Sequence, residues 1–324
     1  MTSVVDTDST AATESTGGSA GASRPRHPQR PVWEEPPGRV AQGLKGATLA
    51  VVILVVLGPL WVVLATSLSD EQTITEAGGL VIIPDGITFD AYWRVLSGGV
   101  VTRAVLVSVG VTAVGTAISM FASVLCAYGL SRSGSFGHRT ILFTLLFTML
   151  FQAGMIPTYL LVDSLGMRDT YWALILPTAI SAFNILVLRA FFMNVAPEMI
   201  ESARIDGASE LRILVQIVLP VSKAVIAVIT LFYAVGYWSS WFNAMLYLDH
   251  ADKWPLQLVL RSYVLQQQSL PSSGATSGID AMGQVPSLAI QMAVMIIAVV
   301  PVLIVYPFVQ RHFTKGMLTG AIKG

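Results

Sequence analysis

The chain has 324 residues, of which 54% are hydrophobic and only 12% charged, and its mean hydropathy is +0.68. Soluble globular proteins carry roughly a quarter charged residues, so this composition argues against a soluble protein and predicts an integral membrane protein. The formal net charge is zero, and we expect no nucleic-acid partner. A single cysteine, Cys126, excludes an intramolecular disulfide.

The N-terminal segment, residues 1–40, is rich in Thr, Ser, Ala, Gly and Pro. It offers too little apolar surface to offset the entropic cost of ordering, so we expect a disordered tail on the cytoplasmic side. No apolar core or cleavage site follows closely on its start, which argues against a signal peptide. Residues 41–324 are then expected to form one transmembrane domain.

Six apolar runs follow along the chain, at about 47–67, 102–130, 141–162, 171–192, 224–248 and 287–309. Each is long enough to cross a hydrocarbon core of about 30 Å as a helix. Each is uniformly apolar rather than alternating, which excludes the strands of a membrane barrel. The runs predict an all-α integral membrane protein with six transmembrane helices.

Charged residues indicate the orientation of these helices. With the N-terminus placed inside, 14 of the 19 Lys and Arg fall on the inner side; the other five are Arg94, Arg103, Arg168, Lys253 and Arg261. This excess predicts that both termini are cytoplasmic. No Asp, Glu, Lys or Arg lies in the middle of a run. Ion-coupled carriers usually place such groups at depth, so the distribution argues against secondary transport.

The second run contains small residues at every fourth position: Gly115, Ser119, Ser123 and Ala127. Small residues on one face of a membrane helix let another helix approach closely. This pattern favours packing within or between subunits over a ligand site.

A charged segment, about residues 194–222, separates the fourth and fifth runs. Pro197 suits the first position of a helix, and the acidic Glu198 and Glu201 suit its first turns. Asp206-Gly207 is expected to end this helix, because glycine permits a bend that other residues resist. A second helix at 208–217 and a turn at Leu219-Pro220 would follow. Spacing alone leaves open that this segment is only a solvated amphipathic linker.

This segment resembles the EAA loop of permease subunits of ATP-binding-cassette importers. The family pattern is Glu-Ala-Ala, three residues, Gly, nine residues, Ile, one residue, Leu-Pro; the matching residues here are Glu201, Ala203, Gly207, Ile217, Leu219 and Pro220. Ser202 stands where the family usually has Ala. The sequence Asp206-Gly207-Ala208 resembles the form that this part of the loop has in the sugar-importing branch of the family. The stretches 233–243 and 306–324 also resemble the second permease of complex-carbohydrate importers.

The resemblance implies the type I importer (MetI-like) permease fold. It also implies that the loop is a coupling helix that docks on a separate ATPase, through Glu201, Ser202, Ala203, Asp206, Gly207, Ala208, Leu219 and Pro220. The implied partners are a second homologous permease, two ATP-binding subunits, an extracytoplasmic solute-binding protein, membrane lipid and a carbohydrate, specifically an oligosaccharide. No phosphate-binding glycine loop occurs in the sequence, so we expect no cofactor and no catalysis in this chain, with ATP used by the partner.

The fifth run carries a patch of polar and aromatic residues that could line a substrate pathway. Gly236, Ser240, Asn243 and Tyr247 recur at helical spacing, with aromatic residues beside them; the candidate lining residues are Trp238, Ser240, Trp241, Asn243 and Tyr247. Hydroxyl, amide and aromatic groups suit a sugar. The alternative is helix packing together with an aromatic belt at the outer interface.

Three other functions are considered beside an importer subunit. An ion-coupled secondary transporter is disfavoured by the lack of charge at depth. A membrane-embedded glycosyl transferase would require carboxylates or a base in a cleft near the interface, whereas the inner-side acids cluster in the charged loop. A passive assembly scaffold is the third.

Overall fold

The structure, a computed structural model, describes residues 39–132, 134–135, 137–266 and 287–321, and in these the backbone forms helices and no strands. The expected N-terminal tail lies outside the described residues, except for Arg39 and Val40. These two residues begin the first helix. The chain divides into two units, residues 1–54 and 55–324. The packing described below is that of the second unit.

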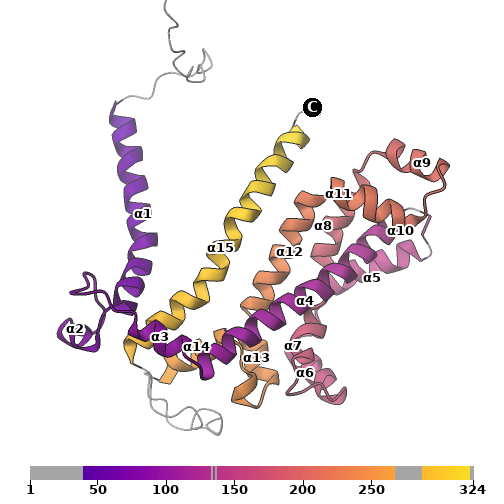
Figure 1. Cartoon of the computed structure of the whole chain (residues 1–324). Coiled ribbons are helices and arrows are strands. Elements are labelled where there is room, and N and C mark those ends of the chain that lie inside the picture. The colour runs from indigo at the N-terminus through magenta and orange to yellow at the C-terminus, as the bar shows by residue number, and fades with distance from the viewer. Residues whose placement is uncertain (1–38, 133, 136, 267–286, 322–324) are drawn as a thin grey trace, which may run out of the picture. The chain divides into compact units, whose positions relative to one another are not determined.

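Three unbroken helices are long: α1 (Arg39–Ser67), α4 (Val100–Ser131) and α15 (Leu288–Ala321) (Figure 1). Each contains a stretch that is long and apolar enough to cross a membrane. In the first unit, every side chain of α1 from Val40 to Leu54 is exposed. A helix that is apolar on all sides and exposed is suited to lipid rather than to water.

The other candidate spans are bent pairs of helices. The pair α5 (His138–Leu150) and α6 (Met155–Ser164) bends by 118°; α7 (Trp172–Ile175) with η1 (Leu176–Thr178) meets α8 (Ala182–Met193) at 51°; and the segment Glu210–Val221 meets α12 (Lys223–Trp238) at 87°. By length and composition, three helices could cross a membrane, or up to six if each bent pair is one span. The third predicted run is therefore sharply bent instead of straight.

Local sequence explains the first two bends. Gly154 adopts φ +83° before α6, a conformation that favours glycine. Pro177 lies in the short η1 helix, and the Ser181 hydroxyl accepts the amide N–H of Asn184 at 3.4 Å to begin α8. Each break thus has a residue that starts the next helix in a new direction.

The remaining elements are short. They are α2 (Glu71–Glu76), α3 (Asp90–Leu96), α9 (Pro197–Ile205), α10 (Glu210–Ile213), η2 (Leu214–Val218), α11 (Leu219–Val221), α13 (Trp241–Tyr247), η3 (Ala251–Lys253) and α14 (Leu256–Gln266). Helix α9 lies between the fourth and fifth candidate spans, and α10 begins the bent fifth one; both fall in the segment where the charged loop was predicted.

Helix α4 packs against α12 and α8 (Figure 1). The small residues of α4 form the contact with α12: the Ser119 hydroxyl lies 2.7 Å from the Tyr237 hydroxyl, and Ser123 lies 2.7 Å from Tyr233. The seam predicted in the second run is therefore confirmed as a packing surface. Two tyrosines fill the space that small side chains leave.

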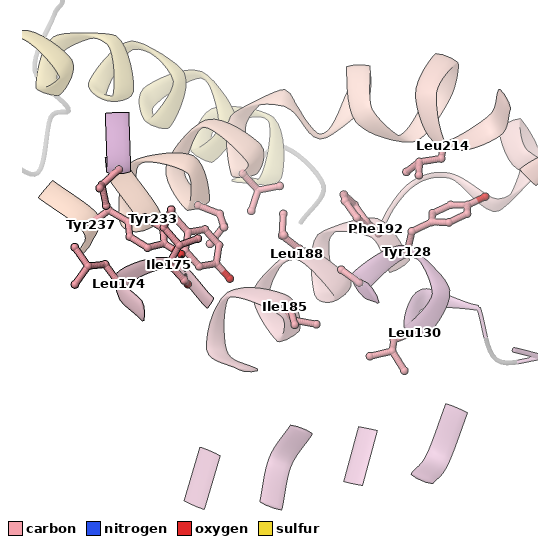
Figure 2. Packing of buried hydrophobic residues seen from close by; sticks show 14 of the residues in the cluster. Tyr128, Leu130, Leu174, Ile175, Ile185, Leu188, Phe192, Leu214, Tyr233 and Tyr237 are labelled. Atoms are coloured by element: carbon pink, nitrogen blue, oxygen red, sulfur yellow. Dashed lines mark hydrogen bonds between the residues drawn. The ribbon is translucent and has the colours of Figure 1, made fainter. Parts of the chain in front are cut away.

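The same tyrosines also bind the break between α7 and α8. The Tyr237 hydroxyl donates to the carbonyl of Ile175 at 3.2 Å, and the amide of Ser181 donates to the Tyr233 hydroxyl at 3.2 Å. Figure 2 shows the tyrosines beside Leu174 and Ile175, with Tyr128, Phe192 and Leu214 toward the other end of the same core. One apolar core thus joins α4, α8 and α12 and continues to the charged loop.

Candidate functional site

The first half of the charged loop is the helix α9. Pro197 occupies its first turn, with Glu198 beside it, as predicted. The helix ends at Ile205, Asp206 is its C-terminal cap, and Gly207 has φ +78°. The amide of Ala208 donates to the Ala203 carbonyl at 2.9 Å, and the amide of Gly207 donates to Arg204 at 3.0 Å. This pair of hydrogen bonds is the usual closure of a helix by a left-handed glycine, so the predicted break is confirmed.

The second half of the loop turns the chain into α12. The Ser209 hydroxyl accepts the amide of Arg212 at 3.4 Å and begins α10, which continues through η2 and α11. Leu219 and Pro220 form α11, and the chain bends after it by 87°. Leu219 and Pro220, where the turn was predicted, are helical, and the bend falls at Ser222, two residues after Pro220.

One side of the loop is anchored in the core, and the other is exposed. Ile200 is only 5% exposed, and Ala203, Ala208 and Leu219 pack partly against the core. The other candidate coupling residues are exposed: Glu201, Ser202, Asp206, Gly207 and Pro220. The loop therefore presents a fixed polar surface.

Exposed apolar side chains, which were not among the predicted site residues, flank this surface. Ile205 is 83% exposed, Leu211 68% and Met199 48%. Apolar groups of this size, gathered beside charged residues on an exposed loop, are typical of a protein-binding surface. Met199 and Ile205 lie on α9 and Leu211 on α10, and their signal in the sequence was an apolar residue among charged ones.

A polar cluster connects the loop to the end of α4. The Arg204 guanidinium is 2.6 Å from one carboxylate oxygen of Glu210, and the Tyr128 hydroxyl donates to the other at 2.6 Å. The Arg132 guanidinium carbon lies 4.9 Å from the centre of the Tyr128 ring. Glu210 was not a predicted site residue, because its partner Tyr128 is 82 positions away. Through it, α9, α10 and α4 are held together.

The candidate pathway residues do not lie on one helix. Helix α12 ends at Trp238, and α13 begins at Trp241. The predicted continuous stripe from Gly236 to Tyr247 was therefore wrong. The Ser240 hydroxyl donates to the Tyr237 carbonyl at 2.8 Å, and such local bonds from serine compete with helix continuation.

Burial separates the candidate pathway residues into two groups. Trp238 is 6% exposed, and its indole N–H donates to the Ala298 carbonyl of α15 at 3.0 Å. Tyr247 is 4% exposed and stacks on Tyr159 with ring centres 6.1 Å apart. These two contacts favour the packing alternative. Ser240, Trp241 and Asn243 are half-buried and remain accessible.

An open groove runs between α4 and α12. It has a volume of about 790 Å³ and is mainly apolar. The hydroxyls of Thr112 and Thr116 lie along it without a hydrogen-bond partner in the described part of the chain, and Lys223 borders it. Polar groups at membrane depth normally face protein or a water-filled cavity.

The loop after α6 and the loop after α13 are joined by Asp169, which has φ 55°. Its carboxylate contacts the Lys253 ammonium, lies 2.6 Å from His250 Nδ1 and accepts the amide of Asp249 at 3.1 Å. Burial raises the pKa of Asp169, but the hydrogen bonds from Lys253 and His250 outweigh it and lower that pKa to about 2.

Comparison with known proteins gives a consistent assignment. The model of the family described as "Binding-protein-dependent transport system inner membrane component" matches residues 115–319. Two relatives are from Bacillus subtilis (strain 168). The polygalacturonan/rhamnogalacturonan transport system permease protein YtcP is 46% identical over 282 residues, covering 86% of this chain and 96% of the relative. Protein LplC is 45% identical over 267 residues, covering 82% and 89%.

Among solved structures, a chain of a bacterial ABC transporter involved in the import of the acidic polysaccharide alginate is similar. The TM-score is 0.74 with 31% identity, covering 85% of this chain and 97% of that chain. The chain belongs to the family of inner-membrane components of binding-protein-dependent transport systems. It is a non-catalytic, membrane-embedded permease subunit of an ABC importer. The resemblance and the all-helical importer fold are confirmed, and the transferase and secondary-transporter alternatives are excluded.

Proposed function

We propose that this importer carries a carbohydrate, specifically an oligosaccharide. The relative YtcP is described as a polygalacturonan/rhamnogalacturonan permease, and the similar solved structure is described as an importer of alginate. High identity over nearly the whole length supports a shared class of substrate. The half-buried Ser240, Trp241 and Asn243 offer the hydroxyl, aromatic and amide groups that a sugar requires.

The remaining partners follow from the importer class. A second, related permease would complete the pathway, and two ATP-binding subunits would hydrolyse ATP on the side of the charged loop. A solute-binding protein would deliver the sugar to the opposite side. Both termini would then be cytoplasmic, in agreement with the excess of Lys and Arg on that side. ATP would be used by the partner, and this chain would need no cofactor.

The geometry of α9 is the observation on which the coupling role rests. Its glycine-closed end and buried Ile200 make it a rigid element, while Glu201, Asp206 and Ile205 remain free to contact an ATPase. Small residues beside them allow close approach.

Movement of α9 has two routes into the membrane. Arg204 and Glu210 connect α9 and α10 to Tyr128 at the end of α4. The continuous segment from Glu210 to Val221 leads into α12. Because α4 and α12 pack closely against each other and both receive these connections, we propose that closure of the ATPases moves the two helices together and switches access to the pathway.

A pair of glycine substitutions tests the coupling role. Gly207 has φ +78° and Gly78 has φ +74°, and a Cβ at either position would meet no atom within 4 Å. Valine at each imposes a similar backbone strain, because β-branched residues avoid positive φ. We expect Gly207→Val to abolish oligosaccharide uptake while the protein still inserts, and Gly78→Val, remote from the loop, to retain uptake. Uptake at the wild-type rate by Gly207→Val would refute the coupling role.

A further inference from the structure

Five basic residues were assigned to the outer side of the membrane, and four of them have a carboxylate partner. The pairs are Arg94–Glu71 at 4.0 Å, Arg103–Asp252 at 3.1 Å, Arg168–Asp249 at 3.0 Å, and Lys253–Asp169. In the part of the chain that the structure describes, Arg261 has no such partner. A half-buried cation without a counter-ion is costly unless something else compensates it.

Arg261 lies on α14, which packs against α13. Its guanidinium carbon is 3.9 Å from the centre of the Trp241 ring. Its Nε atom is buried and has no hydrogen-bond partner among the described residues. The aromatic ring supplies no oxygen acceptor, so the two terminal guanidinium nitrogens, which are not buried, are left for a ligand. Trp241 is itself held edge-to-face by Phe242, with ring centres 5.5 Å apart.

This arrangement matches one kind of sugar. The guanidinium of arginine binds a carboxylate through two parallel hydrogen bonds, and an indole ring offers an apolar face to a sugar ring. Ser240 precedes Trp241 in the break between α12 and α13, and Asn243 lies two residues further on. We propose that Arg261 and Trp241 form a subsite for a carboxylate-bearing residue of an acidic oligosaccharide. This inference rests on the proposed carbohydrate function.

A lipid phosphate is the competing ligand, because arginine and tryptophan often anchor a helix at the membrane interface. Side chains that anchor a helix in this way are exposed at the surface of the protein. Arg261 and Trp241 are both half-buried, and Arg261 Nε is shielded. The partial burial of both side chains favours a ligand that enters the protein over a headgroup at its surface.

Uptake by cells that express the complete importer tests this assignment. The probes are labelled trisaccharides of galacturonate and of alginate, together with their carboxyl-reduced, neutral counterparts. We expect the wild type to import an acidic trisaccharide, and Arg261→Gln to lower that uptake by about tenfold or more, since a hydrogen bond to a charged group contributes roughly 1.5–3 kcal/mol. Arg261→Lys keeps the charge but lacks the planar guanidinium. Its uptake of the acidic trisaccharide should lie between that of the wild type and that of Arg261→Gln.

The matched control is Arg103→Gln, which removes an outer-side arginine that already has a partner, Asp252. It should leave acidic uptake unchanged. Equal acidic uptake by Arg261→Gln and Arg103→Gln would overturn the subsite. So would a loss that follows the content of anionic lipid in the membrane for acidic and neutral sugars alike, since that would identify a lipid anchor.

The two proposals fail in different ways. Import of neutral but not acidic trisaccharides by the wild type would overturn the subsite and leave the carbohydrate function standing. Import of none of these sugars would remove both. The amount of assembled complex, measured by co-purification with the ATPase, shows whether a variant has lost its fold; if Arg261→Gln does not assemble, the comparison of Arg261→Lys with the wild type decides.

Discussion

Gly115 of α4 lies directly against the ring of Tyr237 of α12. A Cβ at residue 115 would be 2.8 Å from Tyr237 Cζ, closer than such contacts are found. The absence of a side chain at Gly115 therefore sets how closely the two helices approach. It also brings the Tyr237 hydroxyl within reach of Ser119 and of the Ile175 carbonyl. One glycine thus positions a tyrosine that connects three elements.

Gly115→Ala should destabilise the permease by about 1–3 kcal/mol, because overpacking forces Tyr237 or the helix to shift. Thermal unfolding of the purified protein in detergent measures this. Gly110→Ala is the matched control on the same helix, since a Cβ there meets no atom within 4 Å. Unfolding of both variants at the same temperature would contradict the close contact.

Glu210→Gln should loosen the charged loop without unfolding the membrane core. The substitution removes the charge that pairs with Arg204, while the amide can still accept from Tyr128. Both partners are about half exposed, so we expect a cost of about 1 kcal/mol. Hydrogen exchange of the α9 amides should become faster. Arg212→Ala, which removes only a bond to Gln216, is the control on the same loop; an equal effect of both would show that the cluster is not specific.

Asp169 should make stability depend on pH in the acid range. Its pKa is lowered from 3.8 to about 2, so the carboxylate contributes stability above about pH 4 that is lost as the pH falls toward 2. The groups that face it are Lys253 and His250. Asp169→Asn removes the charge and still tolerates the positive φ of this position. We expect its unfolding temperature to change less than that of the wild type between pH 5 and pH 2.5; parallel curves would rule out this contribution.

Trp238→Phe should lower stability by about 1 kcal/mol, because the bond from the indole N–H to the Ala298 carbonyl is lost. Since Trp238 is buried, we expect substrate selectivity in the uptake assay to stay the same. Asn243→Ala should instead reduce uptake while assembly is retained, because Asn243 is half-buried and accessible. A change of substrate selectivity in Trp238→Phe would show that Trp238 lines the substrate pathway.

Much of this protein was already readable in its linear pattern. Hydropathy placed the apolar runs, and Pro197 and Gly207 marked the ends of α9, because proline and glycine act on the backbone at their own position. The spacing of small residues on α4 predicted a close packing surface. These are local signals, and each depends on residues within a few turns of one another.

Contacts between distant segments could not be read in this way. The pattern showed neither that Tyr237 would be the partner of Gly115 and Ser119 nor that Glu210 would meet Tyr128, since 82 or more positions separate these residues. The break at Ser239-Ser240 divided a stripe that helical spacing had joined. Arg261 was recognised only as one outer-side charge; its contact with Trp241 arises because folding brings α14 against α13. Which side chains meet depends on how the helices pack, and that depends on the whole chain at once.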